Sequence, residues 1–146
     1  MATKEQALAQ VILGYITEHP ERHDQSQWAD IDDTIKTAEE VNACGTTGCV
    51  AGYSVLFSND PRFEYETNET RTGTYVSIQP KLVKFPDYLG SNGAWFEAGK
   101  ENLGLSETDA KKLFYKTTNE EAREALGYLA RGEKINWPAV RKACNS

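Results

Sequence analysis

The clearest periodic pattern lies near the start of the chain, where apolar residues recur every three or four positions. These residues share one face of a helix: Leu8, Val11, Ile12, Tyr15 and Ile16. We expect the helix to span Thr3 to Glu18, with Thr3 and Gln6 forming a capping box. His19-Pro20 ends it, because a residue before proline avoids the helical region.

The next segment is mostly polar. Residues 21–33 read as a connecting loop that Trp28 anchors to the core. The spacing of Ile31, Ile35 and Ala38 predicts a short helix before Cys44.

Residues 50–57 form a dense apolar run. We expect it to be a buried helix that starts at Gly48-Cys49 and stops at Asn59-Asp60-Pro61.

Within residues 63–78, two stretches show a pattern in which every second residue is of one kind. Phe63, Tyr65 and Thr67 alternate with charged residues, and Thr74, Val76 and Ile78 alternate beyond the turn formed by Arg71-Thr72-Gly73. This pattern predicts a β-hairpin, which Pro80 closes and which must pack on helices to be stable.

The last third again has helical spacing. We expect one helix from Ser91 through Trp95, Phe96 and Leu103, and a second that Ser106 caps. A third helix buries Ala122, Ala125, Leu126 and Leu129 and ends at Gly132, and a short terminal helix spans Ala139–Cys144. The fold class is therefore α+β: a mainly helical single domain, residues 1–146, with five to six helices and one central β-hairpin.

Composition supports a globular protein, with 39% hydrophobic and 26% charged residues. The apolar runs are too short to span a membrane, and the polar start does not resemble an export signal. Three cysteines without such a signal indicate a cytoplasmic protein without a structural disulfide.

Charge is unevenly distributed along the sequence. Residues 1–70 hold 13 acidic and 4 basic residues, whereas residues 71–146 hold 9 acidic and 12 basic residues. An acidic front half disfavours direct nucleic-acid binding. Asp30, Asp32 and Asp33 are candidates for docking on a basic protein partner.

The segment Cys44-Gly45-Thr46-Thr47-Gly48-Cys49 is the most unusual in the chain. Its glycines can serve a tight structural turn, with the cysteines as small buried hydrophobes. Alternatively, a Gly/Thr loop that leads into a helix exposes backbone amides suited to a small anionic ligand, or to a carboxylate of the protein itself.

Metal binding and catalysis are two further hypotheses for this turn. Cys44 and Cys49 are spaced C-x4-C, and with His19 and His23 they would make a Cys2His2 zinc set. A thiol at a helix start is also a candidate nucleophile, with His19 or His23 as base and Asp24 or Gln25 orienting the ring. Over a dozen residues the turn resembles the opening of papain-like and bacteriocin-processing peptidases. Their histidine follows the cysteine, however, and here no histidine follows His23.

Three stretches together resemble a set of small uncharacterised proteins from bacteriophages and bacteria. They are a His-Pro-Glu stretch at His19, the C-G-T-x-x-C-x-A-G turn at Cys44, and an L-G-L-S-x-x-x-A-x-x-L-F segment ending at Phe114. The resemblance implies a phage or mobile-element origin and leaves the activity open.

The sequence contains no cofactor motif and no fixed pair of catalytic carboxylates. We therefore expect a non-enzymatic binding protein that acts as an inhibitor or counter-defence factor. Its partner would be a host protein or a small anionic ligand, bound through the cysteine turn, Trp28 and the three aspartates. A cysteine-dependent hydrolase and a zinc-stabilised interaction domain are the alternatives.

Overall fold

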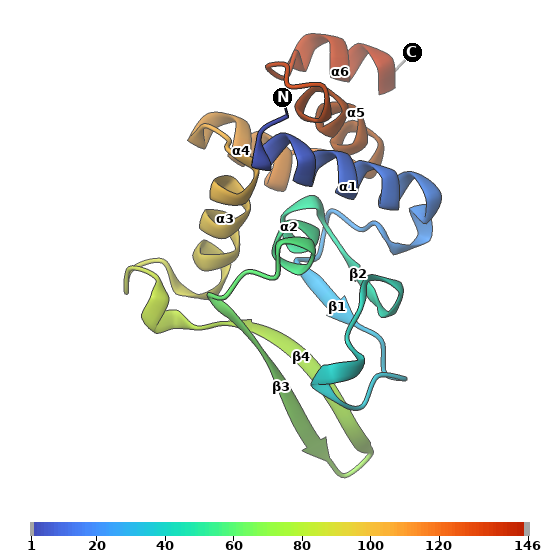
Figure 1. Ribbon diagram of the computed structural model, residues 1–146, viewed down its shortest axis with the longest axis vertical. Helices are drawn as coiled ribbons and strands as arrows, with labels where there is room; N and C mark the ends of the chain where they lie inside the picture. The colour runs from blue at the N-terminus through green and yellow to red at the C-terminus, as the bar shows by residue number, and fades with distance from the viewer. Residues whose placement is uncertain (1, 145–146) are drawn as a thin grey trace.

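A computed structural model describes residues 2–144 and shows a mainly helical α+β fold (Figure 1). The described helices are α1 (Lys4–Glu18), α2 (Val50–Ser58), α3 (Gly90–Leu103), α4 (Glu107–Tyr115), α5 (Asn119–Ala130) and α6 (Trp137–Cys144). The strands are β1 (Ala29–Ile31), β2 (Thr46–Gly48), β3 (Phe63–Thr70) and β4 (Gly73–Pro80). The predicted fold class and the hairpin are confirmed. None of the described helices is long and apolar enough to cross a membrane.

Helix α1 begins and ends where the sequence indicates. The Thr3 hydroxyl accepts a hydrogen bond from the Gln6 N–H at 3.0 Å. The Gln6 side chain does not complete the capping box, because it donates to the Ala130 carbonyl on α5 instead. Ala9, Ile12 and Ile16 form the fully buried stripe, while Val11 is half exposed.

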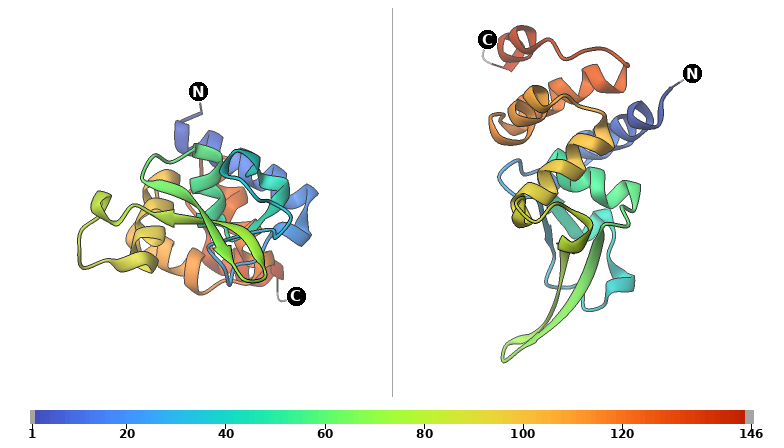
Figure 2. Two further views of the ribbon diagram at one scale, coloured as in Figure 1. Left: turned by 90° about the horizontal axis from the view of Figure 1, so that it is seen from below. Right: turned by 90° about the vertical axis from the view of Figure 1, so that its left-hand side faces the viewer.

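The long hairpin β3–β4 is antiparallel, with Phe63 opposite Pro80 and Thr70 opposite Gly73. Phe63, Val76 and Ile78 lie on one face and are buried, as alternation predicts. The opposite face carries Glu64 and Glu66 and is exposed. The hairpin extends well beyond the helices (Figure 2).

A second small sheet was not expected from the sequence. Strand β1 pairs antiparallel with β2, in the register Ala29–Gly48, Asp30–Thr47 and Ile31–Thr46. The short helix predicted from Ile31 to Ala38 is therefore wrong: its first residue ends β1, and only a single 3-10 turn forms at Ala38–Glu40. Ile31 and Ile35 are nevertheless buried. The spacing of these apolar residues therefore indicates which side chains are buried, and not that the segment is helical.

Two apolar clusters fill the interior. One joins α1, α2, α4, α5 and α6 and includes the fully buried Ile12, Leu113 and Leu126. The other joins the hairpin to α3 and includes Phe63, Ile78 and Trp95. Trp28 packs against both clusters. The described chain begins and ends at the helical end of the molecule, far from the hairpin tip, but on opposite sides of that end (Figures 1 and 2).

Candidate functional site

The cysteine turn is built into the centre of the fold. Cys44 and Gly45 end a 3-10 turn, Thr46 to Gly48 form β2, and Cys49 caps α2. A helix therefore emerges directly from the turn, as the sequence predicts. The Gly48 carbonyl accepts a hydrogen bond from the Asp24 N–H at 2.9 Å, which ties the turn to the loop that carries His23 and Trp28.

Two glycines allow the Trp28 backbone to approach α2. A Cβ atom on Gly48 would lie 2.5 Å from the Trp28 carbonyl oxygen, and one on Gly52 would lie only 1.6 Å from it. Both contacts are with backbone, which cannot swing aside. These glycines are therefore explained by close packing rather than by a ligand.

The N-terminus of α2 already has partners within the protein. The Cys49 N–H donates to the Gln27 carbonyl at 2.8 Å, and the Val50 N–H donates to Gln25 Oε1 at 2.9 Å. The Gly52 N–H points to Cys49 Sγ at 3.4 Å. The amides that the sequence suggested for an anionic ligand are thus engaged by Gln25, Gln27 and Cys49.

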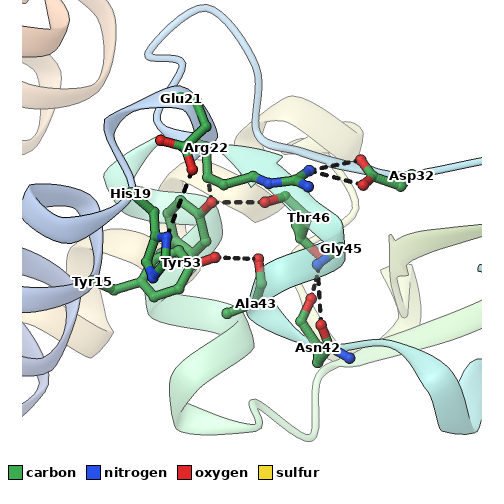
Figure 3. Close-up of polar contacts among 10 residues, drawn as sticks. All are labelled: Tyr15, His19, Glu21, Arg22, Asp32, Asn42, Ala43, Gly45, Thr46 and Tyr53. Carbon is green, nitrogen blue, oxygen red and sulfur yellow. Dashed lines mark hydrogen bonds and ion pairs between the residues drawn. The ribbon is translucent and has the colours of Figure 1, made fainter.

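The two threonines differ in exposure. Thr46 is 2% exposed, and its hydroxyl donates to the Asn42 carbonyl at 2.9 Å. Its own carbonyl lies 2.8 Å from the Tyr53 hydroxyl, which shares its single proton between this oxygen and the Arg22 carbonyl at 2.6 Å (Figure 3). Thr47 remains partly exposed on β2.

The thiols have contrasting environments. Cys49 is buried, and the loss of solvation raises its pKa to about 11, so the thiol is protonated at neutral pH. Burial raises the Cys49 pKa more than the N-terminus of α2 lowers it, whereas the catalytic hypothesis requires a lowered pKa. Cys44 is exposed and lies beside Tyr15. Within residues 2–144, neither thiol forms a hydrogen bond with a histidine.

His23 is buried and points into the protein. Its Nε2 lies 2.8 Å from Gln25 Oε1, so Gln25 orients the ring as the catalytic hypothesis supposed. Asp24 does not, because its carboxylate accepts from the Ser26 hydroxyl at 2.6 Å. Burial lowers the pKa of the His23 ring. The Asn119 side chain on α5 donates a hydrogen bond to the backbone carbonyl of His23.

His19 lies elsewhere: its ring packs at a tilt of 35° against the Tyr15 ring, with centroids 4.7 Å apart, and its Nδ1 is 3.6 Å from the Glu21 carboxylate (Figure 3). In the described part of the chain, no three His, Cys, Asp or Glu side chains come together as a metal-binding group. The hypothetical zinc set of His19, His23, Cys44 and Cys49 is therefore not assembled.

The three aspartates do not form one uniform surface. Both carboxylate oxygens of Asp32 accept hydrogen bonds from the single nitrogen Arg22 Nη1, at 2.8 and 2.9 Å, and this ion pair holds Asp32 in place (Figure 3). Asp30 and Asp33 are exposed.

These two residues belong to a larger acidic region that only the fold reveals. Residues 29–41 and 63–80, which meet through contacts of β1 with β4, form what we call the acidic pole. The acidic pole contains eight acidic and two basic residues, a balance of −6 that equals the formal net charge of the whole chain. The rest of the molecule is electrically balanced.

A second feature lies on the outer side of the loop at residues 25–28. Here the loop faces Asn92 on α3 and Phe114 and Tyr115 on α4 across a cleft of about 300 Å³, which we call the aromatic groove. Trp28 was a candidate from the sequence, but Asn92 and Tyr115 were not. They lie 64 and 87 positions further along the chain, so no local spacing connects them to it.

Comparisons with protein-family models, with curated proteins and with solved structures give no match for this chain.

Proposed function

We propose that this chain is a non-enzymatic binding protein that docks through its acidic pole on a basic surface of a host protein. The observation that carries the proposal is the spatial separation of charge. All of the net negative charge resides in residues 29–41 and 63–80, around a hairpin that projects from the helical body (Figure 2).

The exposed side chains of the acidic pole suit this role. Asp30, Asp33, Glu39, Glu40, Glu64, Glu66 and Glu69 are all exposed. Concentrated charge of one sign accelerates encounter with an oppositely charged surface and helps to orient it. Basic protein surfaces that normally bind phosphate backbones are the natural complement.

The engaged amides of α2 favour a protein target over a small anionic ligand at the turn. The resemblance to small phage and bacterial proteins supports a phage or mobile-element origin. Together these features suggest an inhibitor or counter-defence factor that acts in the host cytoplasm.

The test is affinity capture from a host lysate, followed by measured binding to the captured protein. Reversing two exposed charges of the acidic pole, Asp30→Lys with Glu66→Lys, should weaken binding about tenfold or more and flatten its salt dependence. Asp32 is unsuitable for this test, because replacing it breaks the pair with Arg22.

A matched control reverses two exposed carboxylates on the helical body, Glu18→Lys with Glu124→Lys. This variant has the same net charge and should bind nearly as well as the unaltered protein. Equal losses in both variants would show that only net charge matters, and intact binding in both would reject the acidic pole as the interface.

A further inference from the structure

The aromatic groove combines a flat aromatic surface with unused polar groups. The Trp28 and Tyr115 rings meet at 77°, with centroids 5.8 Å apart, and so form a corner. Tyr115 stacks on Phe96 at 5.5 Å through one face and is 56% exposed, which leaves its other face to solvent. Such a face can stack on a planar ring.

The polar side of the groove is held in place. Asn92 Oδ1 accepts a hydrogen bond from the Trp28 indole N–H at 3.0 Å, which fixes the orientation of the amide. Among residues 2–144, no other group forms a hydrogen bond with Asn92 Nδ2 or with the side-chain amide of Gln27. Asn92 therefore presents two donor hydrogens and a second acceptor lone pair, the combination that pairs with the edge of a purine.

The charge of the residues that line the groove restricts the class of ligand that it can bind. The residues that line the groove are amides, a serine and aromatic side chains, without a Lys or Arg among them. The Asp24 carboxylate, next in sequence to the lining residues, accepts a hydrogen bond from the Ser26 hydroxyl. A phosphate would meet no cation here, and grooves that hold nucleic-acid strands are strongly cationic.

We propose that the aromatic groove binds a neutral nucleobase, presented as a free base or a nucleoside and not as a nucleotide or a strand. The ring stacks on the open face of Tyr115 against Trp28, and its edge pairs with the Asn92 amide. A volume of about 300 Å³ lies at the small end of the range for small-molecule sites and can hold a base or a nucleoside. This site is separate from the acidic pole, and the two proposals can fail independently.

The test is a titration of the purified protein with adenosine. Calorimetry and the NMR signal of the Trp28 indole N–H monitor the titration, and the NMR signal should shift on binding. Tyr115→Ala should weaken binding at least about fivefold, the loss expected for one stacked base. Asn92→Asp keeps the acceptor for the Trp28 indole but removes the free donors, and it should also weaken binding.

Tyr88→Ala is the matched control, because Tyr88 is 86% exposed on another loop and should leave binding unchanged. Thermal unfolding of each variant shows whether the fold is retained. If Tyr115→Ala lowers stability, Asn92→Asp decides the outcome.

Three results would overturn the proposal: no shift of the Trp28 signal at millimolar nucleoside, tighter binding of AMP or an oligonucleotide than of adenosine, or binding of simple glycosides alone. Adenosine binding equal to or tighter than that of AMP supports it.

Discussion

The hydrogen-bond partners of the buried His23 side chain determine which ring nitrogen carries its proton. Gln25 Oε1 accepts from the Val50 N–H, and the Gln25 amide nitrogen donates to the Leu113 carbonyl, so the orientation of this amide is fixed. The oxygen that faces His23 Nε2 is therefore an acceptor, which places the ring proton on Nε2. His23 Nδ1 is buried and has no hydrogen-bond partner among the described residues. The ring is a neutral imidazole held in the interior.

This arrangement predicts loss of stability in mild acid. Burial lowers the pKa of His23, Arg123 adds to the effect, and Gln25 and Asp24 oppose it. Below the unfolded pKa of about 6.5, the unfolded chain binds a proton that the folded protein does not. The free energy of unfolding should therefore fall as pH decreases from about 6.5, by at most about 1.4 kcal/mol per pH unit.

Urea unfolding between pH 7.5 and 5.5 measures this slope. His23→Gln should reduce it, while His19→Gln, at the half-exposed histidine, should retain most of it. The same slope in all three proteins would contradict the assignment to His23.

At the scale of elements, the contact between the loop at residues 23–28 and α2 organises the region around the turn. The Trp28 carbonyl lies against Gly48 and Gly52, and the same loop supplies Gln25 and Gln27 to the first turn of α2. The loop at residues 23–28 is thus a structural cap for α2 on its inner side, and it lines the aromatic groove on its outer side.

This packing predicts opposite effects for two similar substitutions. Gly52→Ala places a methyl group against the Trp28 backbone and should destabilise the protein by about 3 kcal/mol or more. Gly14→Ala, at a position in α1 with open space, should stabilise it by up to about 1 kcal/mol. Chemical denaturation measures both, and a Gly52→Ala variant as stable as the unaltered protein would contradict the contact.

The elements also show what the sequence can predict. Helices α1 and α5 and the β3–β4 hairpin carry strong periodic patterns, α2 is a dense apolar run, and all four were predicted correctly. Strands β1 and β2 have three residues each, too short for alternation to register, and Ala29 pairs with Gly48 across 19 positions. The residues of the turn were recognisable, but Tyr115 and Asn92 join Trp28 only through tertiary packing.

On the scale of the whole molecule, stability is divided between two apolar clusters of different character. The helical cluster contains many side chains with no exposed surface, such as Ile12, Leu113 and Leu126. In the hairpin, buried residues occur only toward its base, at Phe63, Val76, Ile78 and Pro80, and residues 67–74 include none. The outer half of the hairpin therefore rests mainly on its own cross-strand pairs.

Native-state hydrogen exchange should reveal this division. Amides in residues 67–74 should exchange through local opening, whereas the central amides of α1 and α5 should exchange only with global unfolding. Increasing urea should accelerate exchange in the helices and leave the hairpin tip nearly unaffected. Equal protection throughout would mean that the hairpin and the helical body unfold as one unit.

The described chain begins and ends on the helical side of the molecule, away from the hairpin tip, and this has a practical consequence (Figure 1). A tether attached at either end emerges on the side opposite the hairpin. Molecules immobilised on a bead or sensor by such a tether would therefore present the β3–β4 tip outward to solution.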